Sequence, residues 1–543
     1  MTLAMDRRSL ILTGSFGIGA LALGGALRAQ ALLTARGFTH NVASGEPGPD
    51  SILLWTRYVP VNGDDVQLTA ELSTTPDFKV KAGGNAAANR ADDYTARVIV
   101  GGLEPGRTYY YRFVAPDGAV SPVGRTRTLP AGPVERFGLG VFSCANLPYG
   151  WFNAYGHAAA RADIDLMVHV GDYIYEYRRG YYPGADKAVA GRVIEPEGEA
   201  IALADYRLRY ASYRADPDLQ RLHQLFPMIA QHDDHETAND AWQYGAENHH
   251  PDQGDYEARK RASMKAYGEW LPVSGRPWSR FEVGDLATIF RPETRLTARS
   301  RRLDPQAAIA GGGDTVEKLK ALRDGPLADP KRTMMGAEQE QWLYDGFAQS
   351  QQRGAKWQIV AQQVVMGQMR IPELPPALLA NLKLPAEQAA QFNLIAAAGK
   401  AGIAPNLDSW DGFPAARARL LDAAQAVGAD LVVLSGDSHN GWAFDLASQG
   451  KPAGVEFAGH SVSSPGIEEY LSLPPAATAR FIMGASPELK WADTSNRGYM
   501  AIQITPEQVT GEWVFMDTIT THSLATRPGK SMTVQRGRRT FDI

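Results

Sequence analysis

Four groups of chemically active side chains each follow an apolar, strand-like stretch of this sequence. They are Ser-Cys-Ala-Asn at 143–146, Gly-Asp-Tyr-Ile-Tyr at 171–175, His-Asp-Asp-His-Glu at 232–236 with Asn239 beyond it, and Ser-Gly-Asp-Ser-His-Asn at 435–440. An Asp or Asn after a strand often caps the next helix, so one such group alone has a purely structural explanation. Four groups in one chain instead predict a shared site, because functional groups gather beyond the carboxyl ends of the strands in α/β sheets.

The types of these side chains predict a metal centre. Several carboxylates, imidazoles, one thiolate and one phenolate in one crevice would repel one another unless cations neutralised them. Mixed oxygen, nitrogen and sulfur donors favour a transition metal, whereas carboxylate-rich positions suit a harder ion. Two neighbouring ions can hold a phosphoryl group, lower the pKa of a bound water and stabilise the leaving oxygen. The residues therefore predict metal-assisted phosphoester hydrolysis, in which a metal-activated hydroxide or alkoxide attacks phosphorus.

These motifs resemble those of the PhoD-like alkaline phosphatases, a group of calcineurin-like metallophosphoesterases, and the resemblance extends over nearly the whole mature chain. The resemblance implies a four-layer αββα catalytic domain. The Asp-x-x-Tyr spacing of purple acid phosphatases matches Asp172 and Tyr175. The motifs that carry the resemblance are Ser-Cys at 143–144, Gly-Asp-Tyr-Ile-Tyr-Glu-Tyr at 171–177, Asp-Asp-His-Glu at 233–236 and Ser-Gly-Asp-Ser-His at 435–439.

The resemblance also implies a set of metal ligands. Asp172 would bridge two metals, and Cys144 and Tyr175 would bind Fe³⁺. Asp437, which stands where general metallophosphoesterases have a histidine, and His439 would complete the ligands around the iron and its partner. The implied partner is Ca²⁺, with zinc or manganese left open. Tyr173 and Tyr177 are expected to lie on the same face of the chain as Tyr175. The choice of Tyr175 as the ligand therefore rests only on the resemblance and on its spacing from Asp172.

Further roles follow from the same resemblance. Asp234 stands where the superfamily has a ligand asparagine, and Asn239 is a nearby substitute, so the choice between them stays open. His235 matches the histidine that protonates the leaving oxygen or binds phosphate, and Gln363 is a candidate stand-in for another histidine. Arg178, with its neighbour, is either a phosphate-binding group or part of a solvated surface pair. The remaining strand-like and helical histidines are expected to be hydrogen-bonded core residues; they are His157, His169, His223, His232 and His460.

Composition limits the alternatives. The chain has 543 residues, which is too long for one ordinary domain. Its composition, with 44% hydrophobic residues, is typical of a globular protein. A net charge of −5 predicts no general affinity for nucleic acid or anionic membranes, so a phosphate-bearing partner must be held by local cations or metals. Cys144 is the only cysteine, which excludes an intramolecular disulfide.

The N-terminus has the pattern of an export signal. Arg7 and Arg8 precede a Gly-, Ala- and Leu-rich run at 11–27, and Ala-Gln-Ala at 29–31 supplies a small-residue cleavage site. Residues 1–31 are therefore predicted to be a twin-arginine signal peptide read by the twin-arginine translocase. A transmembrane anchor is disfavoured because the run is short and glycine-rich. The mature protein is expected to be periplasmic or secreted.

The chain is expected to contain two domains. Residues 36–130 contain short β-rich runs separated by turn residues, which predict a β-sandwich. Within them, the Pro-Gly turn and aromatic-rich run at 103–113 resemble part of a fibronectin type III module. Residues 136–525 alternate between strands and helices and predict the layered α/β catalytic domain, in which the loops at 177–199 and 371–405 are expected to line the substrate entrance.

Three functions remain open at this stage. The favoured one is an exported phosphomonoesterase or phosphodiesterase of the alkaline phosphatase type. A related one is a phospholipase D-like phosphodiesterase acting on lipid headgroups or wall polymers. The third is a non-catalytic exported binding protein, which the full set of ligand-type residues argues against. The physiological substrate, the oligomeric state and the role of the β-sandwich do not follow from the sequence.

Overall fold

The structure is a computed structural model that describes residues 25–79, 82–371, 386–470 and 473–542. Residues 1–24 of the predicted signal peptide lie outside this part, and its last residues belong to helix α2 (Gly25–Thr34). No helix in the described ranges is long and apolar enough to cross a bilayer.

Most of the described strands belong to two large sheets. The strands of the first sheet are β1 (Gly37–Gly45), β2 (Ser51–Val59), β5 (Thr95–Gly101), β8 (Phe137–Phe142), β9 (Leu166–His169), β10 (Pro227–Ala230), β18 (Gly498–Ile504), β19 (Gln508–Met516) and β20 (Thr526–Gln535). The strands of the second are β11 (Ser279–Val283), β12 (Ala287–Arg291), β13 (Trp357–Ala361), β14 (Leu431–Ser435), β15 (Gly441–Ser448), β16 (Lys451–Ala458) and β17 (Leu489–Asp493). Their spatial orders are β20-β19-β18-β8-β9-β10-β1-β2-β5 and β11-β12-β13-β14-β16-β15-β17.

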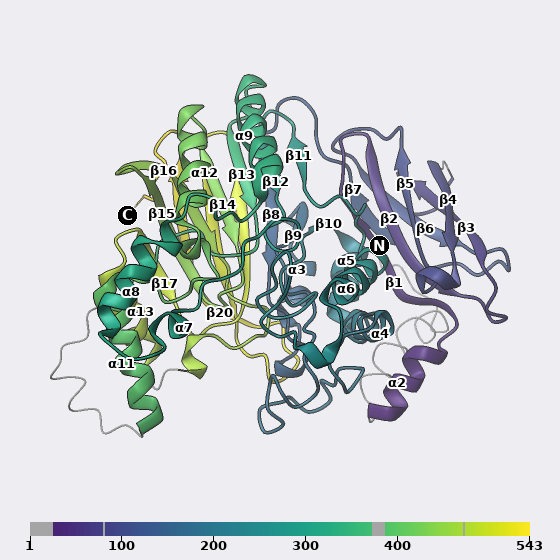
Figure 1. Cartoon of the computed structure of the whole chain (residues 1–543). Coiled ribbons are helices and arrows are strands. Elements are labelled where there is room, and N and C mark those ends of the chain that lie inside the picture. The colour runs from purple at the N-terminus through teal and green to yellow at the C-terminus, as the bar shows by residue number, and fades with distance from the viewer. Residues whose placement is uncertain (1–24, 80–81, 372–385, 471–472, 543) are drawn as a thin grey trace.

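The two large sheets pack face to face. Alternate residues of a strand point to opposite faces, and Val141 and Val168 of the first sheet share one buried cluster with Ile359 and Val432 of the second. The residues that alternate with these four point to the opposite faces of the sheets and contact helices. Met167, for example, lies in a buried cluster with residues of α3 to α6. Helices α9 and α12 cover the outer face of the second sheet in the same way (Figure 1). The helices are α3 (Asn153–Ala159), α4 (Leu203–Arg214), α5 (Pro217–Leu225), α6 (Tyr256–Trp270), α7 (Pro305–Ile309), α8 (Thr315–Asp324), α9 (Gly336–Gln352), α11 (Ala386–Ala401), α12 (Pro414–Ala426) and α13 (Pro475–Ala485).

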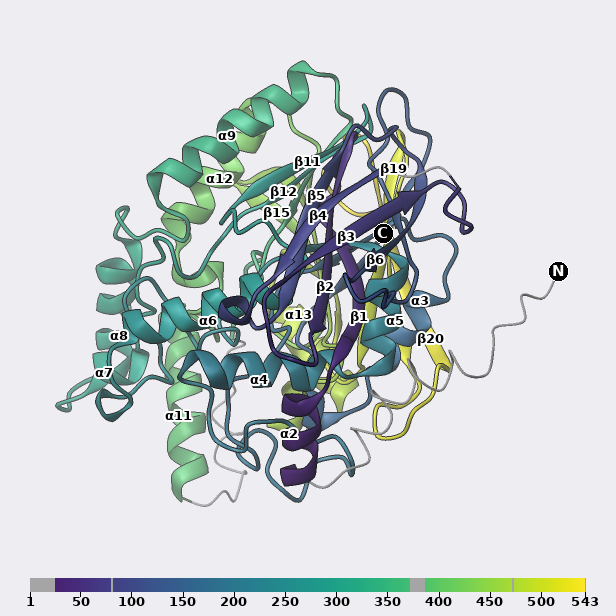
Figure 2. The same ribbon diagram turned by 90° about the vertical axis from the view of Figure 1, so that its right-hand side faces the viewer.

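The N-terminal strands form a second core. A four-stranded sheet with the order β4-β3-β6-β7 packs on β1, β2 and β5, and Leu54 and Phe113 lie in the cluster between the two layers. Its strands are β3 (Val66–Ser73), β4 (Ala82–Ala88), β6 (Thr108–Val114) and β7 (Gly124–Arg127). Figure 2 looks onto these strands. The N-terminal region is therefore β-rich, and the rest of the chain is a large domain of mixed sheets and helices.

The hydrogen bonding of the first sheet continues across the predicted domain boundary. β1 pairs in parallel with β10, with Ser44 opposite Pro227 and Gly45 opposite Met228. The sheet also extends past residue 525, the predicted end of the catalytic domain, because β20 pairs with β19. One layer of the N-terminal region is thus the edge of the sheet that carries part of the candidate site.

Parallel strands bring the candidate residues together. β8, β9 and β10 are parallel neighbours in the first sheet, and β12, β13 and β14 are parallel neighbours in the second. The polar motifs at 143–146, 171–175, 232–236 and 435–440 follow the carboxyl ends of β8, β9, β10 and β14. They therefore meet at one edge of the two packed sheets, as the sequence predicts.

Candidate metal centre

Three of the four motifs meet around Asp172. The Sγ atom of Cys144, a carboxylate oxygen of Asp172 and a ring nitrogen of His439 all lie within 4.8 Å of one another. The Tyr175 hydroxyl donates to Asp172 Oδ2 at 2.9 Å and lies 3.1 Å from His439 Nε2. Tyr173 points elsewhere, because its hydroxyl lies 2.8 Å from His223 Nε2. The geometry thus brings Tyr175, rather than Tyr173, to the other ligand-type side chains.

A second acidic group adjoins the first. Asp172, Asp234 and His235 form one set of potential ligands, and Asp233, Asp234 and Asp437 form another. Buried carboxylate oxygens normally accept hydrogen bonds, since leaving them unpaired is costly. Asp172 Oδ1, Asp233 Oδ2 and Asp234 Oδ1 are buried and have no such partner. These oxygens fit a bound cation, and Asp172 belongs to two of the three groups of potential ligands.

The backbone at the site is strained. Cys144, Asp172, Asp437 and His439 have φ angles of 58°, 54°, 62° and 60°, in the left-handed region that residues other than glycine seldom adopt. Such residues cost about 1–3 kcal/mol each and persist where the surrounding structure holds them, often at functional sites. Four such residues among the predicted ligands indicate that their orientation is maintained at the expense of stability.

Glycines allow the strand-end loops to touch. A Cβ atom on Gly171 would lie 2.3 Å from the Cβ of Asp233, and one on Gly436 would lie 2.5 Å from the Cβ of Ser143. Both contacts are too short for any side chain, so these two positions require glycine. Gly171 lets the loop after β9 touch the loop after β10, and Gly436 lets the loop after β14 touch the loop after β8.

A hydrogen bond to the backbone orients the His439 ring toward Tyr175 and Asp172. His439 Nδ1 lies 2.7 Å from the backbone carbonyl of Pro465, which can only accept, so Nδ1 carries the proton. The lone pair of Nε2 therefore faces Tyr175 and Asp172. A backbone bond of this kind is a common way to fix the tautomer of a ligand histidine.

Burial controls the protonation of the Cys144 thiol and the Tyr175 phenol. Burial, together with the charge of Asp172, raises the pKa of the Cys144 thiol well above its usual value. The pKa of the Tyr175 phenol is raised for the same two reasons. Both shifts favour the protonated forms, and a cation beside the two groups would favour the ionised forms.

Arg295 is a central residue of the site that the sequence analysis missed. Its guanidinium is fully buried and forms ion pairs with four carboxylates, those of Asp233, Asp408, Asp437 at 3.2 Å and Asp234 at 3.6 Å. Arg299 holds the other oxygen of Asp408. Arg295 belongs to the polar run Glu-Thr-Arg at 293–295, just after β12. This strand-end pattern, which identified the other four groups, could have found it.

His235 is held between Glu176 and Tyr175. Its Nδ1 lies 2.8 Å from Glu176 Oε2, and its ring packs on Tyr175 with centroids 4.2 Å apart. Burial lowers the pKa of His235, but the charges of Asp234, Glu176 and Asp172 outweigh burial and raise it well above the usual value. Glu176 therefore stabilises the protonated imidazole that a proton donor needs.

The less secure predicted residues lie in varied surroundings. The side-chain amide of Asn239 donates to Glu247 at 3.1 Å, away from the acidic groups above. The Gln363 side-chain oxygen accepts from the Thr294 hydroxyl at 2.7 Å, and its nitrogen donates to the His232 carbonyl at 2.7 Å. Because both ends of the amide are bonded within the protein, a contact between Gln363 and substrate is disfavoured. Arg178 is exposed. Its role and that of Gln363 in substrate binding stay predictions.

Five further histidines are predicted to be hydrogen-bonded core residues, and this holds only in part, because His157 is half-buried and His232 Nδ1 has no hydrogen-bond partner among the described residues. Four of them bond to neighbouring groups: His157 to Tyr499, His169 to Tyr155, His223 to Tyr173 and His460 to the Val514 carbonyl. Burial lowers the pKa of His169 to about 3. His232 is also buried, with Nε2 3.8 Å from Glu293.

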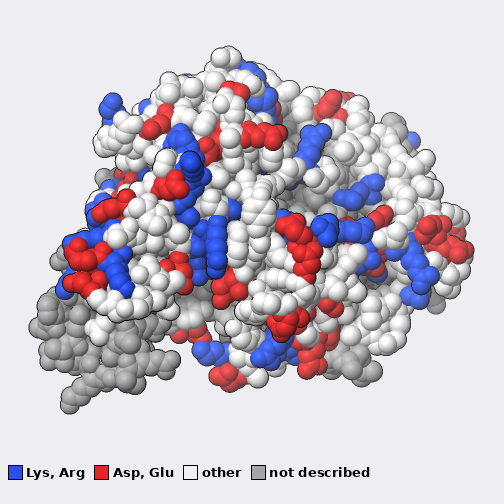
Figure 3. Space-filling model, viewed as in Figure 1, with Lys and Arg blue, Asp and Glu red and all other residues white. Residues whose placement is uncertain are grey.

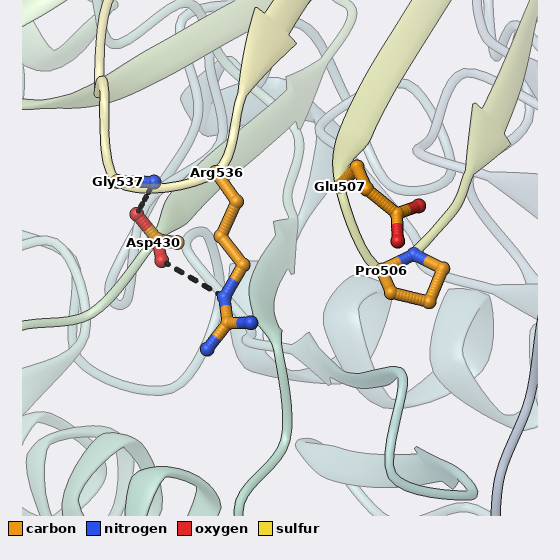
Figure 4. A pocket seen from close by; sticks show the side chains of 5 residues that line it. All are labelled: Asp430, Pro506, Glu507, Arg536 and Gly537. Atoms are coloured by element: carbon orange, nitrogen blue, oxygen red, sulfur yellow. Dashed lines mark hydrogen bonds and ion pairs between the residues drawn. The ribbon is translucent and has the colours of Figure 1, made fainter.

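A surface hollow lies at the opposite end of β14. It has a volume of about 570 Å³ and is lined by Asp430, Pro506, Glu507, Arg536 and Gly537 (Figure 4). Asp430 precedes β14, whereas Asp437 follows it. Two of the three charged residues that line the hollow form an ion pair, with Arg536 Nε 3.8 Å from Asp430 Oδ2. This hollow is therefore separate from the metal-type cluster.

Comparison of the fold identifies a class of protein. The chain shares its fold with the purple acid phosphatase PPD1 from yellow lupin (Lupinus luteus) seeds, with a TM-score of 0.53 and 12% identity over 91% of this chain and 74% of that one. This likeness shows a shared class of fold with two packed sheets, and carboxylate, imidazole and thiol groups that could hold a metal ion lie at one edge of them.

More specific matches identify the family. Residues 139–513 match the PhoD-like phosphatase model, and residues 25–130 match the model of the PhoD-like phosphatase N-terminal domain. The chain is 31% identical to alkaline phosphatase D of Bacillus subtilis (strain 168), over 98% of this chain and 88% of that protein. A solved structure of PhoD superposes with a TM-score of 0.74 and 27% identity, over 94% of this chain and 92% of that one. The chain belongs to the PhoD-like phosphatase family and is a phosphoric ester hydrolase.

Proposed function

We propose that this phosphoesterase is an exported, metal-dependent alkaline phosphatase acting on phosphomonoesters, phosphodiesters or both. The observation that carries the proposal is Asp172, a buried carboxylate shared by a Cys144–His439 group and an Asp234–His235 group. Cys144, Tyr175 and His439 would hold Fe³⁺ on one side of it. Ca²⁺ would lie on the other side, near Asp234.

The proposal assigns the second ion to Asp234 rather than to Asn239. Asp234 has a buried oxygen that accepts no hydrogen bond from the described residues and lies 3.6 Å from the Arg295 guanidinium, whereas the amide of Asn239 is turned toward Glu247. Asp437 contributes from the end of β14, next to Asp234. When bound, the metals would supply positive charge to the phosphoryl oxygens and lower the pKa of water.

The chain's own residues complete the chemistry. His235, protonated and held by Glu176, would donate its proton to the leaving oxygen. Acidic and basic side chains are interspersed over the face in Figure 3, so a substrate phosphate would depend on local groups rather than on a broad charged surface. Exposed Arg178 is the proposed outer contact for phosphate.

Family membership removes the support for a non-catalytic binding protein. Hydrolysis of p-nitrophenyl phosphate and of its bis-ester at alkaline pH, with and without a chelator, is the direct test of the proposal. We expect turnover that the chelator abolishes and that Ca²⁺ restores after mild chelation. The ratio of the two rates gives the preference for monoesters or diesters, including the phospholipase D-like alternative. Turnover that resists exhaustive chelation would contradict the metal-dependent function.

Cys144→Ser tests the iron assignment. Protein purified with its signal intact should contain iron together with calcium, and a thiolate or phenolate bound to ferric ion gives a visible charge-transfer band. We expect the substitution to bleach or shift this band because it removes the thiolate donor. The absorption spectrum and elemental analysis measure both effects. A colourless wild-type protein that contains zinc alone would refute the assignment of iron to Cys144 and Tyr175.

Export is tested at the N-terminus. Arg7→Lys combined with Arg8→Lys is expected to abolish export, since the twin-arginine route reads the arginine pair. Immunoblots of periplasmic or culture fractions measure the mature protein, and Arg36→Lys, beyond the predicted cleavage site, serves as the control. Undiminished export of the double variant would exclude this route.

The proposed architecture is a four-layer αββα catalytic domain, which the two sheets and their covering helices support. The N-terminal core between β1-β2-β5 and β4-β3-β6-β7 supports a fibronectin III-like sandwich.

A further inference from the structure

A row of tyrosine rings runs from the site to the solvent. The Tyr177 ring centroid lies 5.2 Å from that of His235, 5.5 Å from Tyr182 and 5.2 Å from Tyr181. Tyr182 also lies 5.9 Å from Tyr175. We call Tyr177, Tyr181 and Tyr182 the aromatic row. Its inner end packs on buried groups of the site, and its outer end, Tyr181, is 60% exposed.

The aromatic row lies on one particular side of the substrate. In the proposed reaction His235 gives its proton to the leaving oxygen, so the leaving group must lie on the side of the imidazole. Tyr177 packs against that imidazole. The first ring that a leaving group meets beyond the site is therefore Tyr177, and a longer leaving group reaches Tyr181.

The outer end of the aromatic row keeps an exposed aromatic face. Arg178 lies over the Tyr181 ring, with its Cζ atom 5.6 Å from the centroid. Arg178 has no ion pair in the part of the chain that the structure describes, whereas its neighbour Arg179 pairs with Glu195 at 2.8 Å. An aromatic surface bordered by an available guanidinium suits a flat ring attached to an anionic ester. Aromatic rings stack on one another, and a guanidinium attracts both the face of a ring and an anionic group.

We propose that the aromatic row binds a planar aromatic ring in the leaving group, so that aryl and nucleoside phosphoesters are preferred over esters of aliphatic alcohols. This inference rests on the proposed function, because it takes His235 as the proton donor. Tyr177 contacts a ring bonded directly to the ester oxygen, and Tyr181 contacts a ring set farther from phosphorus.

The test compares kcat/KM for three substrates, p-nitrophenyl phosphate, adenosine monophosphate and glycerol phosphate. Loss of one aromatic pair lowers binding by about 2- to 12-fold. Tyr177→Leu should lower kcat/KM for p-nitrophenyl phosphate relative to glycerol phosphate by that factor, mainly through KM. Tyr181→Leu should do so for adenosine monophosphate. Tyr177→Phe should restore the ratio, and Tyr244→Leu, at a tyrosine that is 74% exposed in another loop, should leave it unchanged.

The outcomes separate this inference from the proposed function. Unchanged substrate ratios in both leucine variants would overturn the inference, as would an equal loss for all three substrates, which would show a general structural role. Because Tyr181 is exposed, its variant keeps the test valid if Tyr177→Leu fails to fold. If the metal-loaded wild-type protein hydrolysed none of the three esters, the proposed function would fail, and the inference with it.

Discussion

Asp172→Asn is expected to lower kcat/KM for p-nitrophenyl phosphate by about 1,000-fold or more. Asn is the appropriate replacement because it tolerates the left-handed backbone, with φ at 54°, that Asp172 adopts. It keeps one oxygen but loses the negative charge that a position between two ions requires. Charge stabilisation by metals is worth several kcal/mol, and each 1.4 kcal/mol is a factor of ten in rate.

Elemental analysis should accompany these kinetics. We expect the variant to lose at least one of the two metals, since Asp172 belongs to both ligand groups. Asp430→Asn is a matched control at the other end of β14, in the hollow of Figure 4, and should retain the metals and activity. Retention of both metals and more than a tenth of wild-type activity by Asp172→Asn would rule out a bridging role.

Arg295→Met is expected to destabilise the protein by about 3–5 kcal/mol, the usual cost of removing one partner from a buried ion pair. The guanidinium is fully buried, and its loss leaves Asp233 without its cation and Asp408 with Arg299 alone. The midpoint of denaturant unfolding, measured with and without metal, reports the loss. Arg295→Lys should recover only part of it, because an ammonium cannot match the planar fork of arginine.

Two further variants make this prediction specific. Arg353→Met removes a partly exposed pair with Glu282 and should cost no more than about 1 kcal/mol. Combining Arg295→Met with Asp233→Asn should regain stability, since the second change removes a carboxylate that the first leaves unpaired. An Arg295→Met protein as stable as Arg353→Met would contradict the counter-cation role of Arg295.

The metal-type site was largely predictable because its residues lie in short, contiguous motifs. Cys144, Asp172 and His439 each follow an apolar strand within a few residues. Parallel strands place such strand ends at one edge of a sheet, so a local pattern was enough to predict a shared site. The selection of Tyr175 rested on resemblance, and the geometry that favours it, its bond to Asp172, is a tertiary contact.

Contacts between distant segments were not predictable in the same way. Gln363 follows β13 as a site residue would, yet its amide is used by Thr294 and by the backbone at His232. Nothing in the sequence near Gln363 specifies these partners. For the same reason Arg295 appeared as one more polar residue of a loop, although it forms ion pairs with four acidic side chains from other segments.

The sequence alone predicted the order of strands and helices around the site, the four polar motifs and their metal chemistry, because periodicity and strand-end motifs are local properties of the chain. Only the tertiary structure decided that β1, β2 and β5 extend the sheet of the catalytic domain, through the pairing of β1 with β10. It also decided which carboxylates face Arg295 and which have oxygens that remain unpaired. These features depend on hydrogen bonds and charges that meet only when residues distant in the sequence pack together.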